Sequence, residues 1–159
     1  MHNNYVYIKI PSLSVNESFA RAAVAAFCSS LNPTMNEISD IKTAVSEAVT
    51  NAVVHAYEDE IGEIEIQCRI KGQVVEIIVE DFGCGIADVE KAREPLFTTR
   101  PELERSGMGF SVMESFMDDL VVLSEKDVGT KVILRKKISE KKLKTLNEES
   151  DDESSEDEE

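Results

Sequence analysis

A nearly uncharged helical segment in the first half of the chain places the strongest constraint on the fold. Residues 43–57 read TAVSEAVTNAVVHAY and contain one formal charge, Glu47, although 31% of the 159 residues are charged. Apolar residues recur at helical spacing from about residue 36 to 57, which predicts a helix over that range. Because residues four apart lie in one slanting row on a helix, Glu47, Asn51 and His55 share a row.

That row lacks the lysines and glutamates that surround the polar face of an ordinary surface helix. We therefore expect both sides of the helix to be covered, one by a sheet and the other by something other than bulk water. A carboxylate in such a wall is costly unless it is paired or used. Two interpretations stay open here. Either the polar groups are satisfied within the fold, or a ligand covers the wall, with Asn51 ligating a hard cation such as Mg²⁺ and Glu47 acting as a base.

The segments around this helix predict an α+β domain. Strands are expected at 5–10, 63–70, 73–81, 120–124 and 130–136, because their apolar residues alternate or run continuously between turn residues. Ser14 and Glu17 have the spacing of a capping box that opens a helix through residue 31. A short helix is expected near 88–94 and another around Phe110 and Met113. This order predicts a two-layer sandwich with helices on one face of a mostly antiparallel mixed sheet.

The charge of the chain is concentrated at its end. Nine of the 32 acidic residues fall in the last twelve positions, which contain no base and no apolar residue. We expect residues 138–159 to be a basic-then-acidic disordered tail after a domain over 1–137. No basic face with interleaved aromatics argues for nucleic acid. No signal peptide or membrane span is recognised, and the three cysteines lack metal-site spacing, so a cytoplasmic protein is expected.

Two glycine-containing loops stand where a nucleotide site would need them. EDFGCGI at 80–86 ends a predicted central strand with Asp81 and then carries two glycines. ERSGMGF at 104–110 opens a predicted helix, so Ser106 to Gly109 would present free N–H groups suited to phosphate. A P-loop is absent, the dinucleotide fingerprint lacks its third glycine, and DFG lacks the catalytic loop of protein kinases.

Together, E-x-x-x-N on a helix, D-x-G-x-G, G-x-G before a helix and Gly129-Thr130 opening a strand resemble the ATP-binding fold shared by gyrase, Hsp90, histidine kinases and MutL. A closer resemblance lies in PSLSVNESFARAAVAAF, LNPTMNEISDIKTAVSEAVTNAVVHAYE and PLFTTRPELERSGMGFSVMESFMDDL. These segments are similar to the anti-sigma F factors of endospore-forming bacteria, which are serine protein kinases. The resemblance covers roughly residues 5 to 136 and leaves out the acidic tail.

The resemblance implies an ATP-dependent serine kinase that sequesters a sporulation sigma factor, sigma F, and phosphorylates its anti-anti-sigma factor. It also implies a homodimer, ATP and Mg²⁺, with Asn51 as the metal ligand, Glu47 as the general base, and Asp81, supported by Thr130, as acceptor for the adenine amino group. The partner-contacting residues would be Glu17, Arg21 and Arg105. The other nucleotide-binding residues would be Gly83, Gly85, Thr98, Thr99, Arg100, Arg105, Ser106, Gly107, Met108 and Gly109.

Two alternatives are retained. One is a non-catalytic nucleotide-binding anti-sigma module. The other is an ATPase or histidine-kinase-type catalytic domain. The sequence argues against it because His2 and His55 are the only histidines, and no dimerisation helix carries a phosphoacceptor histidine. The chain also departs from the family pattern. Ala56 replaces a glycine, Cys84 puts a thiol in the nucleotide loop, and Phe82 is expected to pack against adenine or the core.

Overall fold

A five-stranded sheet in the order β1-β2-β3-β5-β4 forms one layer of the structure, a computed structural model that describes residues 3–95 and 109–140. Every neighbouring pair of strands is antiparallel, so the expected mixed sheet is corrected to a wholly antiparallel one. The predicted α+β class and the central place of β3 are confirmed. The strands are β1 (Asn4–Pro11), β2 (Glu63–Lys71), β3 (Val74–Asp81), β4 (Asp119–Glu125) and β5 (Gly129–Lys137).

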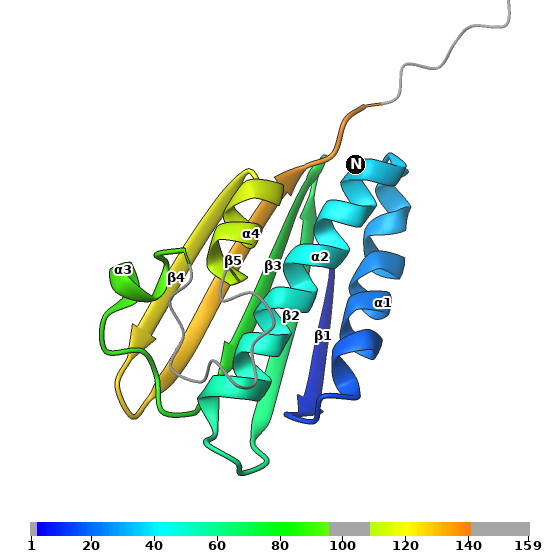
Figure 1. Ribbon diagram of the computed structural model, residues 1–159. Helices are drawn as coiled ribbons and strands as arrows, with labels where there is room; N and C mark the ends of the chain where they lie inside the picture. Colours follow the sequence, from blue (N-terminus) through cyan, green and yellow to red (C-terminus); the bar gives the residue numbers. More distant parts are fainter. Residues whose placement is uncertain (1–2, 96–108, 141–159) are drawn as a thin grey trace, which may run out of the picture.

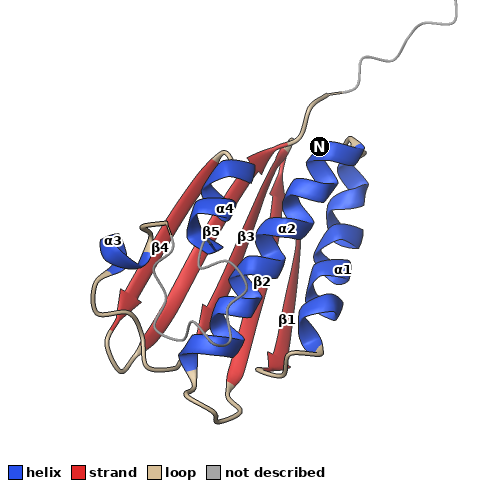
Figure 2. Cartoon of the chain, in the orientation of Figure 1, coloured by secondary structure: helices blue, strands red, loops and turns tan. Residues whose placement is uncertain are grey.

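The helices lie together on one face of this sheet, and the described residues place no helix on the opposite face (Figures 1 and 2). The long helix that the sequence predicts is α-helical only to Asn51 and then widens into a π-helical turn, η2. A π turn of this kind is often found at functional sites. The helices are α1 (Asn16–Cys28), a 3₁₀ turn (Ser29–Leu31), α2 (Met35–Asn51), η2 (Ala52–Ala56), α3 (Val89–Ala92) and α4 (Gly109–Phe116).

The capping box lies at α2, not at α1 as predicted. Thr34 Oγ1 accepts the N–H of Glu37 at 3.2 Å, and the Glu37 carboxylate accepts the N–H of Thr34 at 2.8 Å. Helix α1 follows Val15 without a side-chain cap. The carboxylate of Glu17 is used elsewhere, because it accepts the Ser46 hydroxyl of α2 and pairs with Arg21.

The core fills the space between the sheet and the helices. Along β2 and β3 every second residue is buried, which places one row of each strand against the helices. The opposite row carries ion pairs such as Lys9 with Glu63 and Arg135 with Glu76. The largest fully buried side chains include Ile41, Val45, Val49, Ile64, Ile66, Ile77, Met113 and Leu134.

The packed part of the chain continues past the expected domain boundary at residue 137. Ile138 is fully buried and its N–H donates to the Gln73 carbonyl at 2.8 Å. The N–H of Ser139 donates to Glu37 Oε1 at 2.8 Å, which fastens the end of β5 to the start of α2. Within the described residues no helix combines the length and apolar character that a bilayer crossing requires.

Candidate functional site

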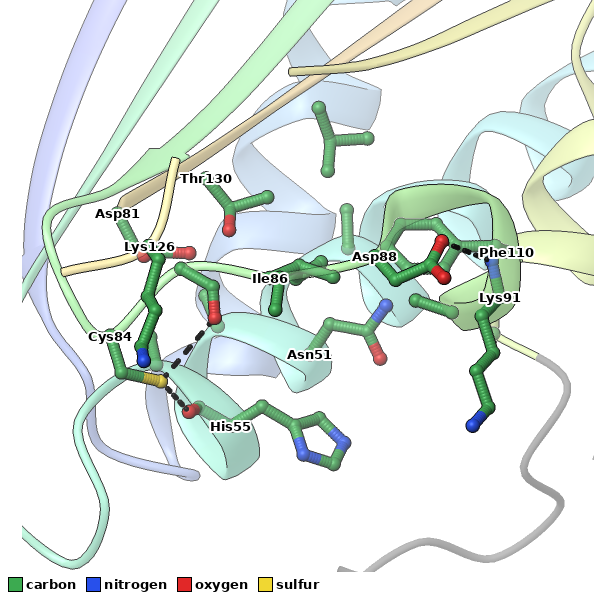
Figure 3. Close-up of a pocket in the computed structure, with 18 of the residues that line it drawn as sticks. Asn51, His55, Asp81, Cys84, Ile86, Asp88, Lys91, Phe110, Lys126 and Thr130 are labelled. Carbon is green, nitrogen blue, oxygen red and sulfur yellow. Dashed lines mark hydrogen bonds between the residues drawn. The ribbon is translucent and has the colours of Figure 1, made fainter. Parts of the chain in front are cut away.

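A pocket of about 620 Å³ opens between α2 and the loops at one end of the sheet. This volume lies within the range of small-molecule sites. Its walls come from α2 and η2, the segment between β3 and α3, the start of α4 and the β4–β5 turn (Figure 3). Three alanines four residues apart, Ala48, Ala52 and Ala56, line the helical wall beside Asn51 and His55. Their small side chains leave the space that longer ones would fill.

On one side of the pocket, the first residue of α4 approaches the polar row of α2. A Cβ atom added to Gly109 would lie 3.1 Å from Asn51 Oδ1 and 3.3 Å from Glu47 Oε2. The missing side chain therefore lets the start of a helix, with its unpaired N–H groups, come close to an amide and a carboxylate. Asn51 and Gly109 line the pocket, and Glu47 lies half-buried one turn before Asn51. The structure thus brings three of the predicted residues together.

Asp81 and Thr130 lie on another wall of the pocket, where β3 and β5 are paired in register (Figure 3). Asp81 is only 7% exposed, and Oδ1 accepts the N–H of Gly83 at 3.1 Å. Burial raises the pKa of the Asp81 carboxyl, and backbone hydrogen bonds from Gly83 and Thr130 oppose this in part. A buried acceptor at a pocket wall is suited to an exocyclic amino group.

Ser124 does not line the pocket but supports this wall, and the sequence did not single it out. Its hydroxyl shares a 2.8 Å hydrogen bond with the Thr130 hydroxyl and accepts the N–H of Ile86 at 2.7 Å. It also donates to the carbonyl of Gly129 at 3.0 Å. Ser124 therefore fixes both the Thr130 side chain and the loop after β3. The signal that could have identified it is the β4–β5 register, which places Ser124 opposite Thr130.

The glycines of the loop after β3 serve packing within the chain. A Cβ atom on Gly83 would lie 2.0 Å from the Ala56 carbonyl oxygen, and Gly83 does not line the pocket. Gly85 does line it, but its φ of +68° and a Cβ position 2.0 Å from the Glu125 carbonyl oxygen explain the glycine. Both glycines hold the loop against its neighbours, which in turn shapes the pocket wall.

The departures from the family pattern have separate outcomes. Phe82 is 49% exposed, so the alternative in which it packs against the core is wrong, and it is not part of the pocket lining. Its N–H donates to the Tyr57 hydroxyl at 2.9 Å. Cys84 lines the pocket and its thiol donates to the His55 carbonyl at 3.1 Å (Figure 3). Burial raises the pKa of this thiol, which disfavours the reactive thiolate.

Two of the expected partner residues, Glu17 and Arg21, lie one turn apart on α1 and form an ion pair at 3.6 Å. The Glu17 side chain is 21% exposed and is held toward α2 by Ser46, whereas that of Arg21 is 42% exposed. Val15 and Phe19, four residues apart at the start of α1, are also exposed, at 71% and 54%. An exposed cation and exposed apolar groups on one helical segment are suited to a protein partner.

Several predicted residues fall outside the described ranges. These are Thr98, Thr99, Arg100, Arg105, Ser106, Gly107 and Met108. Among residues 3–95 and 109–140, no three acidic, histidine or cysteine side chains form a metal cluster. Within the pocket, Asn51 offers its amide oxygen as a ligand for a hard cation.

Comparisons with known proteins agree with this geometry. Residues 10–136 match the family model described as histidine kinase-like ATPase domain. The chain is 55% identical over 136 residues to an anti-sigma F factor of Clostridium kluyveri, covering 86% of this chain and 96% of the relative. It is 58% identical over 139 residues to that of Clostridium novyi, covering 87% and 97%. With the anti-sigma F factor of a Geobacillus species the identity is 54% over 140 residues, covering 87% and 96%.

Proposed function

This chain belongs to the anti-sigma F factors and carries a histidine kinase-like ATPase domain, and from that premise we propose that it is an ATP-dependent protein serine kinase. Its proposed substrate is a serine of the anti-anti-sigma factor, and it also sequesters the sigma factor sigma F. The protein acts as a homodimer in the cytoplasm. β1 supports the dimer as an edge strand that pairs with β2 alone and exposes Tyr5 and Tyr7.

One observation carries the kinase proposal: a single pocket joins the carboxylate of Asp81 with the amide of Asn51 and the start of α4. Figure 3 shows Asp81 and Thr130 on one side of the space and Asn51 between them and Phe110. An adenine amino group fits the first wall, and phosphates fit the helix start. The nucleotide would lie across Ala48, Ala52 and Ala56 of α2 and η2, where the helix surface has no charged side chain.

Mg²⁺ fits this pocket through one protein ligand. A triphosphate supplies several oxygen ligands and water supplies others, so a single amide oxygen, that of Asn51, is enough from the protein. Bound Mg²⁺ would neutralise charge on the phosphates as the phosphoryl group is transferred. The position of Gly109 keeps the Asn51 amide in contact with the start of α4, where the phosphates would lie.

Glu47 supplies the proposed base. Its carboxylate lies one helical turn from Asn51 and close to Gly109. When the serine hydroxyl of the partner attacks the terminal phosphorus of ATP, Glu47 takes the hydroxyl proton and the bond to the leaving ADP breaks. The partner would dock on α1, where the Arg21 guanidinium and the Phe19 ring are both exposed.

The deciding experiment incubates the full chain with MgATP and the anti-anti-sigma factor and examines that partner by mass spectrometry. The expected product is one phosphoserine, stable to acid. An acid-labile phosphohistidine would favour the histidine-kinase-type alternative. Sigma factor binding without any phosphorylated product would leave only the non-catalytic anti-sigma module. The Glu47→Gln variant provides the matched control for contaminating kinases.

A further inference from the structure

A lysine occupies an inward-facing position of β5 where the strand pattern predicts an apolar side chain. Val132, Leu134 and Lys136 alternate with half-exposed neighbours, and all three are buried. Lys136 is 9% exposed, and the described part of the chain holds only two other buried polar residues, Ser12 and Asp81. A buried ammonium requires partners, because an unpaired charge in the interior is costly.

The partners of Lys136 come from two helices. Its Nζ donates to the carbonyl of Phe116, the last residue of α4, at 2.7 Å. The same Nζ lies 3.2 Å from Asp40 Oδ2 on α2. A cation at the carboxyl end of a helix also complements the helix dipole. One ammonium on the sheet therefore joins the end of α4 to the first half of α2.

Both helices enter the nucleotide pocket at their opposite ends. Helix α4 begins at Gly109, which lines the pocket and approaches Asn51. Helix α2 ends at Asn51, about three turns after Asp40. A rigid shift of α4 along α2 would change the spacing between the first N–H groups of α4 and the Asn51 amide. The Lys136 contacts oppose that shift.

Stability alone does not account for a lysine at this position. Replacing a buried ion pair by apolar side chains of similar size is often neutral or stabilising, so such a pair is weak support for a purely stabilising role. What the ammonium adds is a fixed arrangement, because it bonds a backbone carbonyl on one helix and a carboxylate on the other.

We propose that Lys136 is a positioning residue for the phosphate half of the nucleotide pocket, holding the start of α4 in register with Asn51 of α2. This inference rests on the proposed function, since it presupposes that a nucleoside triphosphate occupies the pocket. It assigns no contact between Lys136 and the nucleotide. Asp81 and Thr130, on the adenine side, belong to β3 and β5 and are held independently of α4.

The experiment uses the full chain and two probes that differ only in their phosphates, adenosine and MgATP, titrated by calorimetry. In Lys136→Met the side-chain length is kept and the ammonium is lost. We expect the affinity for MgATP to fall about ten- to a hundredfold, as for a remote change that misplaces a site by about 1 Å. The affinity for adenosine should change less than about twofold, and Lys136→Arg should recover most of the loss.

Glu114→Gln is the matched control. Glu114 also belongs to α4 and pairs with Arg93 at 3.4 Å, but its carboxylate is 64% exposed. An exposed pair of this kind contributes little, so this variant should bind both probes as the wild type does. Asp40→Asn removes the ion pair between Lys136 and α2 but keeps the hydrogen bond to the Phe116 carbonyl. It should therefore lower the affinity for MgATP by less than Lys136→Met does.

The outcomes separate this inference from the proposed function. A wild type that binds neither probe would refute the nucleotide pocket itself. A wild type that binds both, with a Lys136→Met variant that loses neither or loses both equally, would refute only the positioning role. Should Lys136→Met fail to fold, Asp40→Asn takes its place, and an unchanged ratio of the two affinities in that variant would overturn the proposal.

Discussion

Replacing Asp81 by Asn tests the adenine side of the pocket with the least change in shape. The carboxylate offers two acceptor oxygens, and the N–H of Gly83 already occupies Oδ1 at 3.1 Å. The amide has one acceptor and one donor group. If its oxygen keeps the bond to Gly83, its NH₂ group must face the amino group of adenine, so that two donors oppose each other.

This conflict sets the expected magnitude. A hydrogen bond to a charged acceptor contributes about 1.5–3 kcal/mol, and a buried polar group without its partner costs about 1–3 kcal/mol. Because Asp81 is 7% exposed, water cannot readily take over either role. We expect a loss of roughly 2–3 kcal/mol, which is about a thirty- to 150-fold weaker binding of adenosine.

Competition titrations with adenosine and inosine provide the assay. Inosine carries a carbonyl oxygen where adenosine carries the amino group, so the side-chain amide introduced by Asp81→Asn can donate to it. The affinity of the variant for inosine should therefore rise relative to its affinity for adenosine. The unliganded variant should unfold at no lower temperature, because burial raises the pKa of Asp81 and so disfavours its charge in the folded state. Unchanged adenosine affinity, or an equal loss for both nucleosides, would refute the assignment of Asp81.

Three further predictions address the base, the loop and the helix cap. Glu47→Gln should slow phosphoryl transfer about 10²- to 10⁴-fold in single-turnover assays while MgATP affinity stays within about twofold, and normal transfer would remove Glu47 from the role of base. Gly83→Ala should lower the free energy of unfolding by roughly 1–3 kcal/mol or more in denaturant titrations, because its Cβ would meet backbone of Ala56, whereas Gly109→Ala, which meets only side-chain ends, should be far milder. Burial raises the pKa of Glu37, but hydrogen bonds from Thr34 and Ser139 outweigh it and lower that pKa from 4.5 to about 2. Wild type should therefore exceed Glu37→Gln in stability by up to about 1 kcal/mol above pH 4.5, with the difference closing as the pH falls toward 2, and a constant difference would contradict the low pKa.

Local periodicity predicted the elements of this fold because each strand and helix has one buried face. The strand at 63–70 alternates in the sequence as it does in burial, whereas 73–81 is apolar on both faces and its burial alternates only through packing. Prediction from local sequence fails where the same pattern occurs at two places and only one of them forms the structure. Ser14-x-x-Glu17 and Thr34-x-x-Glu37 are equivalent capping signals in the sequence. Only the second is a cap, because Ser46, 29 residues away along the chain, binds the carboxylate of Glu17.

The site was predictable where one helix or one strand end sets it. Glu47 and Asn51 follow from helical spacing, and Asp81 follows from the end of a strand. Ser124 did not follow, since its role depends on the register of β4 against β5 and on a loop from elsewhere in the chain. The π-helical turn after Asn51 also lacked a local signal. The π-helical turn contacts the loop after β3, where the N–H of Cys84 donates to the Ala56 carbonyl at 2.7 Å.

The scarcity of charge over residues 43–57, which cover the end of α2 and η2, has a physical cause in the packing of this segment. One face contributes Ile41, Val45 and Val49 to the core, and any charge there would be buried. Ala48 and Ala52 are buried with them, and they also form part of the wall of a 620 Å³ pocket. Lysine or glutamate at these positions would occupy the space and bring its own charge beside Asn51. Asn51 and His55 of the polar row border this open volume, and small neutral residues beside them leave space for a charged ligand and add no charge that would repel it.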